Sequence, residues 1–252
     1  MIIDYPTLSQ KQGLYALWEE AFGDSEEFID LFFSTAFSEK RCRCVMQNSE
    51  VIAALYWFDC FINNQKTAYI YAVATKKSHR GQGVCAALMD NTHSLLKDRG
   101  YSGAVLVPGS KELFSFYEKM NYKTCCFNET FFCAAGEKEI SIKEIDEAEF
   151  ARLRRELLPS GGIVQENENL RFLKTMMSFF KGENFLLAAR KNSDKLVAAE
   201  LLGDKALAPK IVKALACKEG SFRIPAKTSP FAMFFPFEKD TEIPNYLGFA
   251  FD

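Results

Sequence analysis

Within residues 11–37, hydrophobic residues recur every three to four positions in two sets: Leu14, Leu17, Trp18, Ala21 and Phe22, and then Phe28, Ile29, Phe32 and Phe33. This spacing places the apolar side chains on one face of a helix, so it predicts two short helices. Gly23 is a typical residue at a helix end, and Asp24 or Ser25 can cap the start of the second helix.

The next segments are rich in β-branched and aromatic residues, at 41–47, 51–62 and 67–75, and the turn signals Asn48-Ser49 and Asn63-Asn64 separate them. They predict an antiparallel meander. A helix over about 82–97, a stop at Gly100 and a strand at 102–108 follow. A strand, a helix and a second buried strand form a crossover, so the sheet changes from antiparallel to parallel at the loop after Thr75. Mixed sheets commonly bind ligands at such a change.

The chain continues with a helix over about 110–120 and a strand over 122–134, and it becomes highly charged near Gly136. We therefore expect two domains, residues 1–135 and 136–252. The second part predicts helices near 146–158, 167–180 and 206–217, a hairpin at 184–203, and strands at 221–226, 231–237 and 246–252. The Phe-rich strand 231–237 is either core or one wall of an acceptor pocket. The element order repeats although the residues do not, and the fold class is α+β: in each half a mixed, mostly antiparallel sheet flanked by helices.

Composition narrows the possible functions. The 252 residues are 48% hydrophobic with a net charge of −2, which is typical of a folded protein and gives no general attraction to nucleic acid or to an anionic membrane. The N-terminus lacks the pattern of a secretory signal, and no apolar run is long enough to span a membrane, so we expect a cytoplasmic protein. Eight cysteines without paired C-x-x-C spacing, together with two histidines, argue against a bound metal.

The loop ATKKSHRGQGVCAALM, residues 74–89, carries the candidate chemistry. Gly81 and Gly83 allow consecutive backbone N–H groups to converge where a helix begins, and that arrangement suits a diphosphate. Arg80 adds a fixed positive charge, and Lys76 and Lys77 can reach further phosphate groups. The alternative is a plain turn.

The flanking residues favour the phosphate site. Ala72-Val73-Ala74-Thr75, followed after four residues by Arg80-Gly81-Gln82-Gly83-Val84-Cys85, resembles the acetyl-CoA signature of the Gcn5-related N-acetyltransferase (GNAT) superfamily. The run Phe116-Tyr117-Glu118-Lys119 resembles the second signature of that family. Two positions depart from the pattern. Cys85 replaces a glycine or alanine and should narrow the site, and Asn121 replaces a glycine in a position where we expect a left-handed backbone.

The resemblance implies acetyl-CoA as co-substrate. It would be held by residues at the loop and the preceding strand: Val73, Thr75, Arg80, Gly81, Gln82, Gly83, Val84 and Cys85. The backbone N–H near Val73 would polarise the acyl oxygen, and Tyr117 would protonate the coenzyme A sulfur, unless it only packs beside the thioester. Many relatives carry a glutamate on the strand before the loop, where this chain has Tyr69-Ile70-Tyr71. Asp59 is the candidate general base, with an exposed strand residue as the alternative, and water or the C-terminal carboxylate as other routes.

The second half has no arginine-glycine-x-glycine run. It therefore resembles the degenerate domain of tandem GNAT proteins, among them the enhanced-intracellular-survival group of mycobacteria, which uses its terminal carboxylate in catalysis. The function implied is transfer of an acetyl group to a primary amine of a small molecule or peptide. A non-catalytic acyl-CoA-binding or sensing protein is the alternative, and near-neutral charge disfavours an aminoacyl-tRNA-dependent transferase. The acceptor and the oligomeric state stay open.

Overall fold

The computed structural model describes residues 1–138 and 140–251, and these form two compact units. Unit 1 consists of residues 1–123 and 233–242, and unit 2 consists of residues 124–232 with the segment from Ile243 onward. These units differ from the expected division after residue 135 in two segments. The strand that follows Lys123 packs in unit 2, because it pairs with a strand there, and residues 233–242 return to unit 1.

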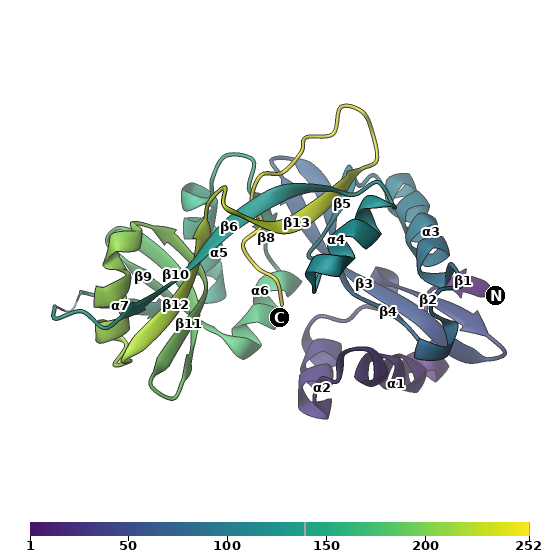
Figure 1. The fold of residues 1–252 in the computed structure, drawn as a ribbon, viewed down its shortest axis with the longest axis horizontal. Coiled ribbons are helices and arrows are strands. Elements are labelled where there is room, and N and C mark those ends of the chain that lie inside the picture. The colour runs from purple at the N-terminus through teal and green to yellow at the C-terminus, as the bar shows by residue number, and fades with distance from the viewer. Residues whose placement is uncertain (139, 252) are drawn as a thin grey trace. The chain divides into compact units, whose positions relative to one another are not determined.

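Unit 1 contains a six-stranded mixed sheet with helices on both faces (Figure 1). Its elements are β1 (Ile2–Asp4), α1 (Lys11–Phe22), α2 (Glu26–Thr35), β2 (Cys42–Gln47), β3 (Glu50–Ile62), β4 (Gln65–Thr75), α3 (Val84–Asp98), β5 (Gly103–Leu106) and α4 (Lys111–Glu118). The strand order is β1-β2-β3-β4-β5-β13, where β13 (Ser229–Pro236) reaches this unit with residues 233–236. Neighbouring strands are antiparallel except β4 and β5, which are parallel. The expected switch at the loop after β4 is therefore confirmed.

Unit 2 repeats this arrangement. Its elements are β6 (Lys123–Ala134), β7 (Lys143–Ile145), α5 (Glu147–Leu157), β8 (Ile163–Gln165), α6 (Glu168–Met176), β9 (Ser178–Gly182), β10 (Phe185–Asn192), β11 (Lys195–Gly203), α7 (Ala208–Ala214) and β12 (Glu219–Pro225). The strand order is β7-β9-β10-β11-β12-β6, and the pair β11–β12, which α7 connects, is parallel. In each unit, the second strand of the crossover also pairs with an antiparallel strand that is distant in the sequence: β5 with β13 in unit 1, and β12 with β6 in unit 2.

Two expected elements differ from the structure. The helix expected over 167–180 ends at Met176, because Ser178–Gly182 pairs with β10 as strand β9. The strand expected over 246–252 is an extended segment with an isolated bridge between Tyr246 and Gly162. Its backbone is bound by a side chain: the amide of Gln165 donates to the Phe249 carbonyl and accepts from the Phe249 N–H, both at 3.0 Å.

The two faces of the unit 1 sheet carry different cores. Aromatic side chains cover the face toward α1 and α2, where Trp18 lies 5.3 Å from Tyr56 and 5.7 Å from Tyr71 between ring centroids. Aliphatic residues and Trp57 cover the face toward α3. Figure 1 shows α1 and α2 on one side of strands β2–β4 and α3 on the other. This alternation follows from the period of two along each strand.

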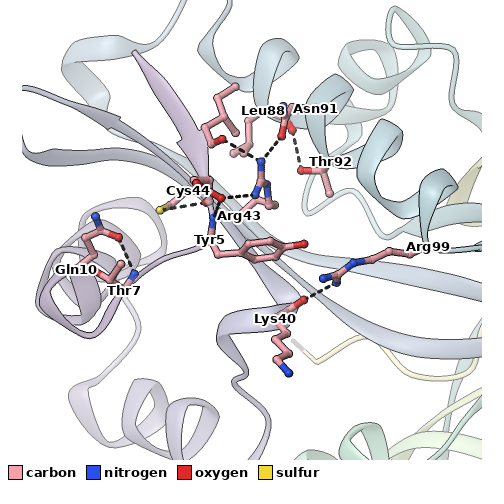
Figure 2. A network of polar contacts seen from close by, with 12 residues as sticks. Tyr5, Thr7, Gln10, Lys40, Arg43, Cys44, Leu88, Asn91, Thr92 and Arg99 are labelled. Carbon is pink, nitrogen blue, oxygen red and sulfur yellow. Dashed lines mark hydrogen bonds and ion pairs between the residues drawn. The ribbon is translucent and has the colours of Figure 1, made fainter.

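Arg43 of β2 holds α3 in place (Figure 2). Its guanidinium is 7% exposed and donates to the Asn91 side chain of α3 at 2.6 Å, to Asp4 at 3.0 Å and to the Ile3 carbonyl at 2.9 Å. It also stacks over the ring of Tyr5. The two terminal nitrogens of this buried guanidinium reach three acceptors and so connect β1 and α3 to the sheet, and α3 begins at the candidate site.

No helix in the described part of the chain has the length and apolar character needed to cross a membrane.

Candidate functional site

Strands β4 and β5 separate next to the loop. Their parallel pairing runs from Thr67–Gly103 to Ile70–Leu106 and ends there. On the other side of β4, Ala54 pairs with Ala74 and Tyr56 with Tyr71, so two residues of β4 lie opposite the single residue Leu55. This bulge contains Ala72, whose φ of 47° is rare for a residue with a side chain. A bulge of this kind bends the strand that carries the extra residue, here β4, beyond the last residue that pairs with β5.

Backbone groups on the open side of β4 are left without a strand partner. The N–H of Lys76 bonds to the Ile52 carbonyl of β3 at 2.8 Å. Because successive N–H groups alternate in direction along a strand, those of Val73 and Thr75 point away from β3, toward the side that β5 has left. The N–H that the sequence assigned to the acyl oxygen, near Val73, is therefore directed at the opening between the strands.

The loop after β4 ends in two left-handed glycines. Gly81 has a φ of 73° and Gly83 a φ of 78°, and a Cβ at either position would meet nothing within 4 Å. Backbone conformation, and not crowding, therefore requires glycine here. The first hydrogen bond of α3 runs from Ala87 N–H to the Gly83 carbonyl at 3.0 Å, so the N–H groups of residues 84–86 precede it. These amides and the open space over the glycines lie where the sequence predicts an anion site.

Side chains brace the loop itself. Arg80 Nε donates to the Thr75 carbonyl and the Gln82 side chain donates to the Ser78 carbonyl, both at 3.0 Å. His79 Nδ1 lies 2.9 Å from the Ser78 hydroxyl. The glycine turn is thus held in shape by contacts within the loop.

Thr75 of β4, Cys85 of α3 and Tyr117 of α4 lie near one another, and Cys85 follows the glycine turn by two residues. The Thr75 hydroxyl is buried without a well-formed hydrogen bond, although the Cys85 thiol lies beside it. Burial raises the pKa of Cys85 to about 11, against a smaller lowering by Thr75. A buried polar atom that lacks a good partner, beside a residue in the first turn of α3, is compatible with a bound phosphate ester.

Tyr117 is the residue of this group best suited to donate a proton. It is 7% exposed, and burial, with the nearby Cys85 as a smaller cause, raises the pKa of its phenol well above 10. Its hydroxyl has no hydrogen-bond partner in the described part of the chain. The phenol therefore stays protonated at neutral pH and is free to donate.

The helix end after Tyr117 matches the expectation for Asn121, which has a φ of 64°. Tyr122 N–H donates to the Tyr117 carbonyl at 3.1 Å and Asn121 N–H to the Glu118 carbonyl at 2.9 Å, which is the Schellman pattern. The Tyr122 hydroxyl lies 2.7 Å from His93 Nε2 of α3. This buried contact ties the end of α4 to α3.

The structure does not bring Asp59 together with the glycine turn. Its carboxylate accepts from the Tyr101 hydroxyl at 2.5 Å and pairs with Lys66 Nζ at 3.2 Å. Asp59 lies opposite Ala68, seven residues before Thr75 on β4, which is about 23 Å along a strand. Its position gives no support to a role as general base. The expected route through a C-terminal carboxylate falls on Asp252, the last residue of the sequence, which lies outside the described residues.

Sequence reasoning missed two features of the site. Ala72 forms the bulge, and nothing in the run Tyr-Ile-Tyr-Ala-Val distinguishes it from an ordinary strand residue. Glu20 of α1 accepts the Lys77 N–H at 2.6 Å, and the sequence shows it only as one of several helical glutamates. Among the residues described, no group of three or more His, Cys, Asp or Glu side chains is placed to hold a metal ion.

A model of a family described as an acetyltransferase (GNAT) domain matches residues 3–125. The chain therefore contains a GNAT-family domain. That domain includes strands β1 to β5, helices α1 to α4 and the glycine turn. The two signatures, the bulge and the separated strands therefore all belong to it.

Solved structures are similar over most of the chain. A GCN5-related N-acetyltransferase from Kribbella flavida is 15% identical, with a TM-score of 0.71 over 92% of this chain and 70% of that one. One from Anabaena variabilis is 13% identical, with a TM-score of 0.72 over 92% and 72%. Eis1 from Mycobacterium abscessus is 10% identical, with a TM-score of 0.69 over 94% and 74%. At these identities the likeness concerns the fold, and it extends well beyond the GNAT domain.

Proposed function

We propose that this chain transfers an acetyl group from acetyl-CoA to a primary amine of a small molecule or peptide. The observation that carries the proposal is the left-handed glycine turn at the start of α3, at the point where β4 and β5 separate. The match of residues 3–125 to an acetyltransferase domain supports it.

The residues of the turn would bind the diphosphate of the coenzyme. The N–H groups of residues 84–86 and the positive end of the α3 dipole supply hydrogen bonds and partial charge, and exposed Arg80 adds a full charge. The Val73 N–H would donate to the acyl carbonyl oxygen, which stabilises the negative charge that develops there during attack. Acetyl-CoA supplies the acyl group as a thioester.

Two protons must move during the reaction. Tyr117 would give its phenolic proton to the departing sulfur, since burial keeps the phenol neutral. The attacking amine must be neutral, and Asp59 is bound by Tyr101 and Lys66. We assign removal of the amine proton to water that enters between the separated strands.

Unit 2 would serve as a GNAT-like domain without a coenzyme site. It has the strand order of unit 1, but its crossover contains the seven-residue helix α7 with a proline in its first turn. Gly203 precedes that helix by five residues, and no pair of closely spaced glycines stands at its start. The elements that would bind a diphosphate in unit 1 are thus absent from the corresponding described segment of unit 2.

Calorimetric titration with CoA and acetyl-CoA tests binding, and thiol release over a panel of amines tests transfer. Tyr117→Phe should lower kcat about 100-fold, because it removes a general acid, and should change the affinity for CoA less than about twofold. Tyr15→Phe removes a phenol that is bound to Asp30 on the α1 side and should leave kcat unchanged. Equal rates for Tyr117→Phe and the unmodified protein would refute the role of Tyr117.

The engagement of Asp59 favours a second candidate, a non-catalytic acyl-CoA-binding protein. Binding of CoA without thiol release to any amine of the panel would support this candidate over the transferase. Failure to bind CoA at millimolar concentration would remove both.

A further inference from the structure

We infer that Glu20 is a positioning residue for coenzyme binding: from α1 it fixes the loop that ends in the glycine turn. The inference rests on the proposed function, because it concerns the same site. The contact is the hydrogen bond of 2.6 Å from Lys77 N–H to Glu20 Oε1.

Lys77 begins the single 3₁₀ turn Lys77–His79, which leads directly to Arg80 and the glycines. The residue before it, Lys76, provides no side-chain cap for this turn, because a lysine ammonium carries only donors and cannot accept an N–H; it pairs with Glu50. The first N–H of the turn therefore depends on an acceptor from another element. Glu20 supplies it, with the additional strength of a charged acceptor.

The helix that carries Glu20 is firmly seated on the sheet. Leu14, Leu17 and Trp18 of α1 are at most 4% exposed, and a Cβ at Gly13 would already meet Val51 at 3.0 Å. A side chain on such an element can hold a loop within the narrow limits that ligand binding requires. The loop then keeps its shape before any ligand arrives.

Electrostatics alone would predict the opposite effect of Glu20. A carboxylate near an anion site repels a diphosphate. If repulsion were the only effect of Glu20, removing its charge would strengthen the binding of CoA. If Glu20 positions the loop, removing it weakens the binding of CoA. The direction of the change in affinity therefore distinguishes the two explanations.

The surroundings of Glu20 allow its side chain to be shortened without disturbing the hydrophobic core. A groove of about 630 Å³ runs between α1 and the β2–β3 turn, and Glu20, Glu50 and Lys76 are among its lining residues. Water can replace the side chain from this groove, so shortening Glu20 leaves no buried cavity. The neighbouring Glu19 is exposed on the same helix and offers a variant with the same change of charge.

The test measures CoA affinity by calorimetry for Glu20→Ala, Glu20→Gln and Glu19→Ala. We expect Glu20→Ala to bind about fivefold more weakly, which equals about 1 kcal/mol and is typical for loss of a cap. Glu20→Gln keeps an oxygen acceptor and should bind within about twofold of the unmodified protein. Glu19→Ala should bind as tightly as the unmodified protein, or slightly more tightly.

Hydrogen exchange of the ligand-free protein gives an independent readout. The amides of residues 77–79 should exchange faster in Glu20→Ala, with an unchanged thermal midpoint. If Glu20→Ala binds CoA as well as Glu19→Ala does, or if Glu20→Gln loses as much affinity as Glu20→Ala, the inference is wrong. If the unmodified protein does not bind CoA, the proposed function is wrong. The hydrogen-exchange rates of residues 77–79 then decide alone whether Glu20 fixes the loop.

Discussion

Protonation of His93 should destabilise unit 1 between pH 6.5 and pH 4. The imidazole lies on α3, is 7% exposed, stacks on Phe235 at 4.6 Å and contacts the Tyr122 hydroxyl at 2.7 Å. Burial lowers the pKa of His93 from 6.5 to about 4. The unfolded chain therefore binds a proton in this range that the folded chain does not, so stability falls as the pH falls.

The magnitude follows from the two pKa values. A difference of about 2.5 pH units between unfolded and folded states corresponds to about 3.4 kcal/mol when the pH falls below both values. Between pH 7 and pH 5 the same linkage gives a loss of about 1.8 kcal/mol. Most of the effect should therefore be visible before the carboxylates begin to protonate.

Urea unfolding, monitored by tryptophan fluorescence, measures this loss of stability in unit 1. Both tryptophans of the chain, Trp18 and Trp57, lie in unit 1. His93→Gln keeps a polar group for the Tyr122 hydroxyl but cannot be protonated. From pH 7 to pH 5 its unfolding free energy should therefore fall by about 1.8 kcal/mol less than that of the unmodified protein. His79→Gln, in the exposed loop, is the matched control and should keep the pH dependence of the unmodified protein. Identical pH dependence in His93→Gln and the unmodified protein would refute a buried, neutral histidine.

Further substitutions test the turn, the core of unit 2 and the end of α4. Gly83→Ala forces a side chain into a φ of 78° and should weaken CoA binding about fivefold or more in calorimetry, whereas Gly109→Ala, with open space and no such φ, should not. Arg154→Met leaves the buried carboxylate of Glu200 without its bidentate partner and should lower the free energy of unfolding by about 3–5 kcal/mol in denaturant. A smaller loss of unfolding free energy in the double variant, Arg154→Met with Glu200→Met, would confirm that the unpaired charge is the cause. Asn121→Ala should cost about 1 kcal/mol in the fluorescence assay and Asn121→Gly almost nothing, because only the former resists a positive φ; equal losses would contradict this.

Local patterns were sufficient to predict the meander, the crossover and the shape of the glycine turn. Each depends on residues close together in the sequence: Gly81 and Gly83 select a left-handed backbone, and Asn121 does so at a helix end. The same holds for Ser25, whose hydroxyl caps α2 as expected. Intrinsic conformational preferences decide such features.

The return of residues 233–236 to unit 1 could not be predicted in the same way. An apolar run such as FAMFF is compatible with any buried strand, and its partner β5 lies more than 120 residues earlier in the chain. The position of Asp59 was equally hidden, because its partners Lys66 and Tyr101 belong to β4 and to the approach to β5. Only the three-dimensional pairing of strands brings these groups together.

The pairing of β13 with β5 has a consequence for biosynthesis. Phe235 of β13 lies opposite Ala104 of β5, so the sheet of the GNAT domain gains its last strand only after the ribosome has made more than 120 residues beyond β5. Until then the outer edge of β5 offers unpaired N–H and carbonyl groups to any other extended polypeptide nearby. A nascent chain stalled or cleaved before residue 233 carries every residue of the coenzyme loop, yet its central sheet is open on one side and prone to aggregate with its neighbours.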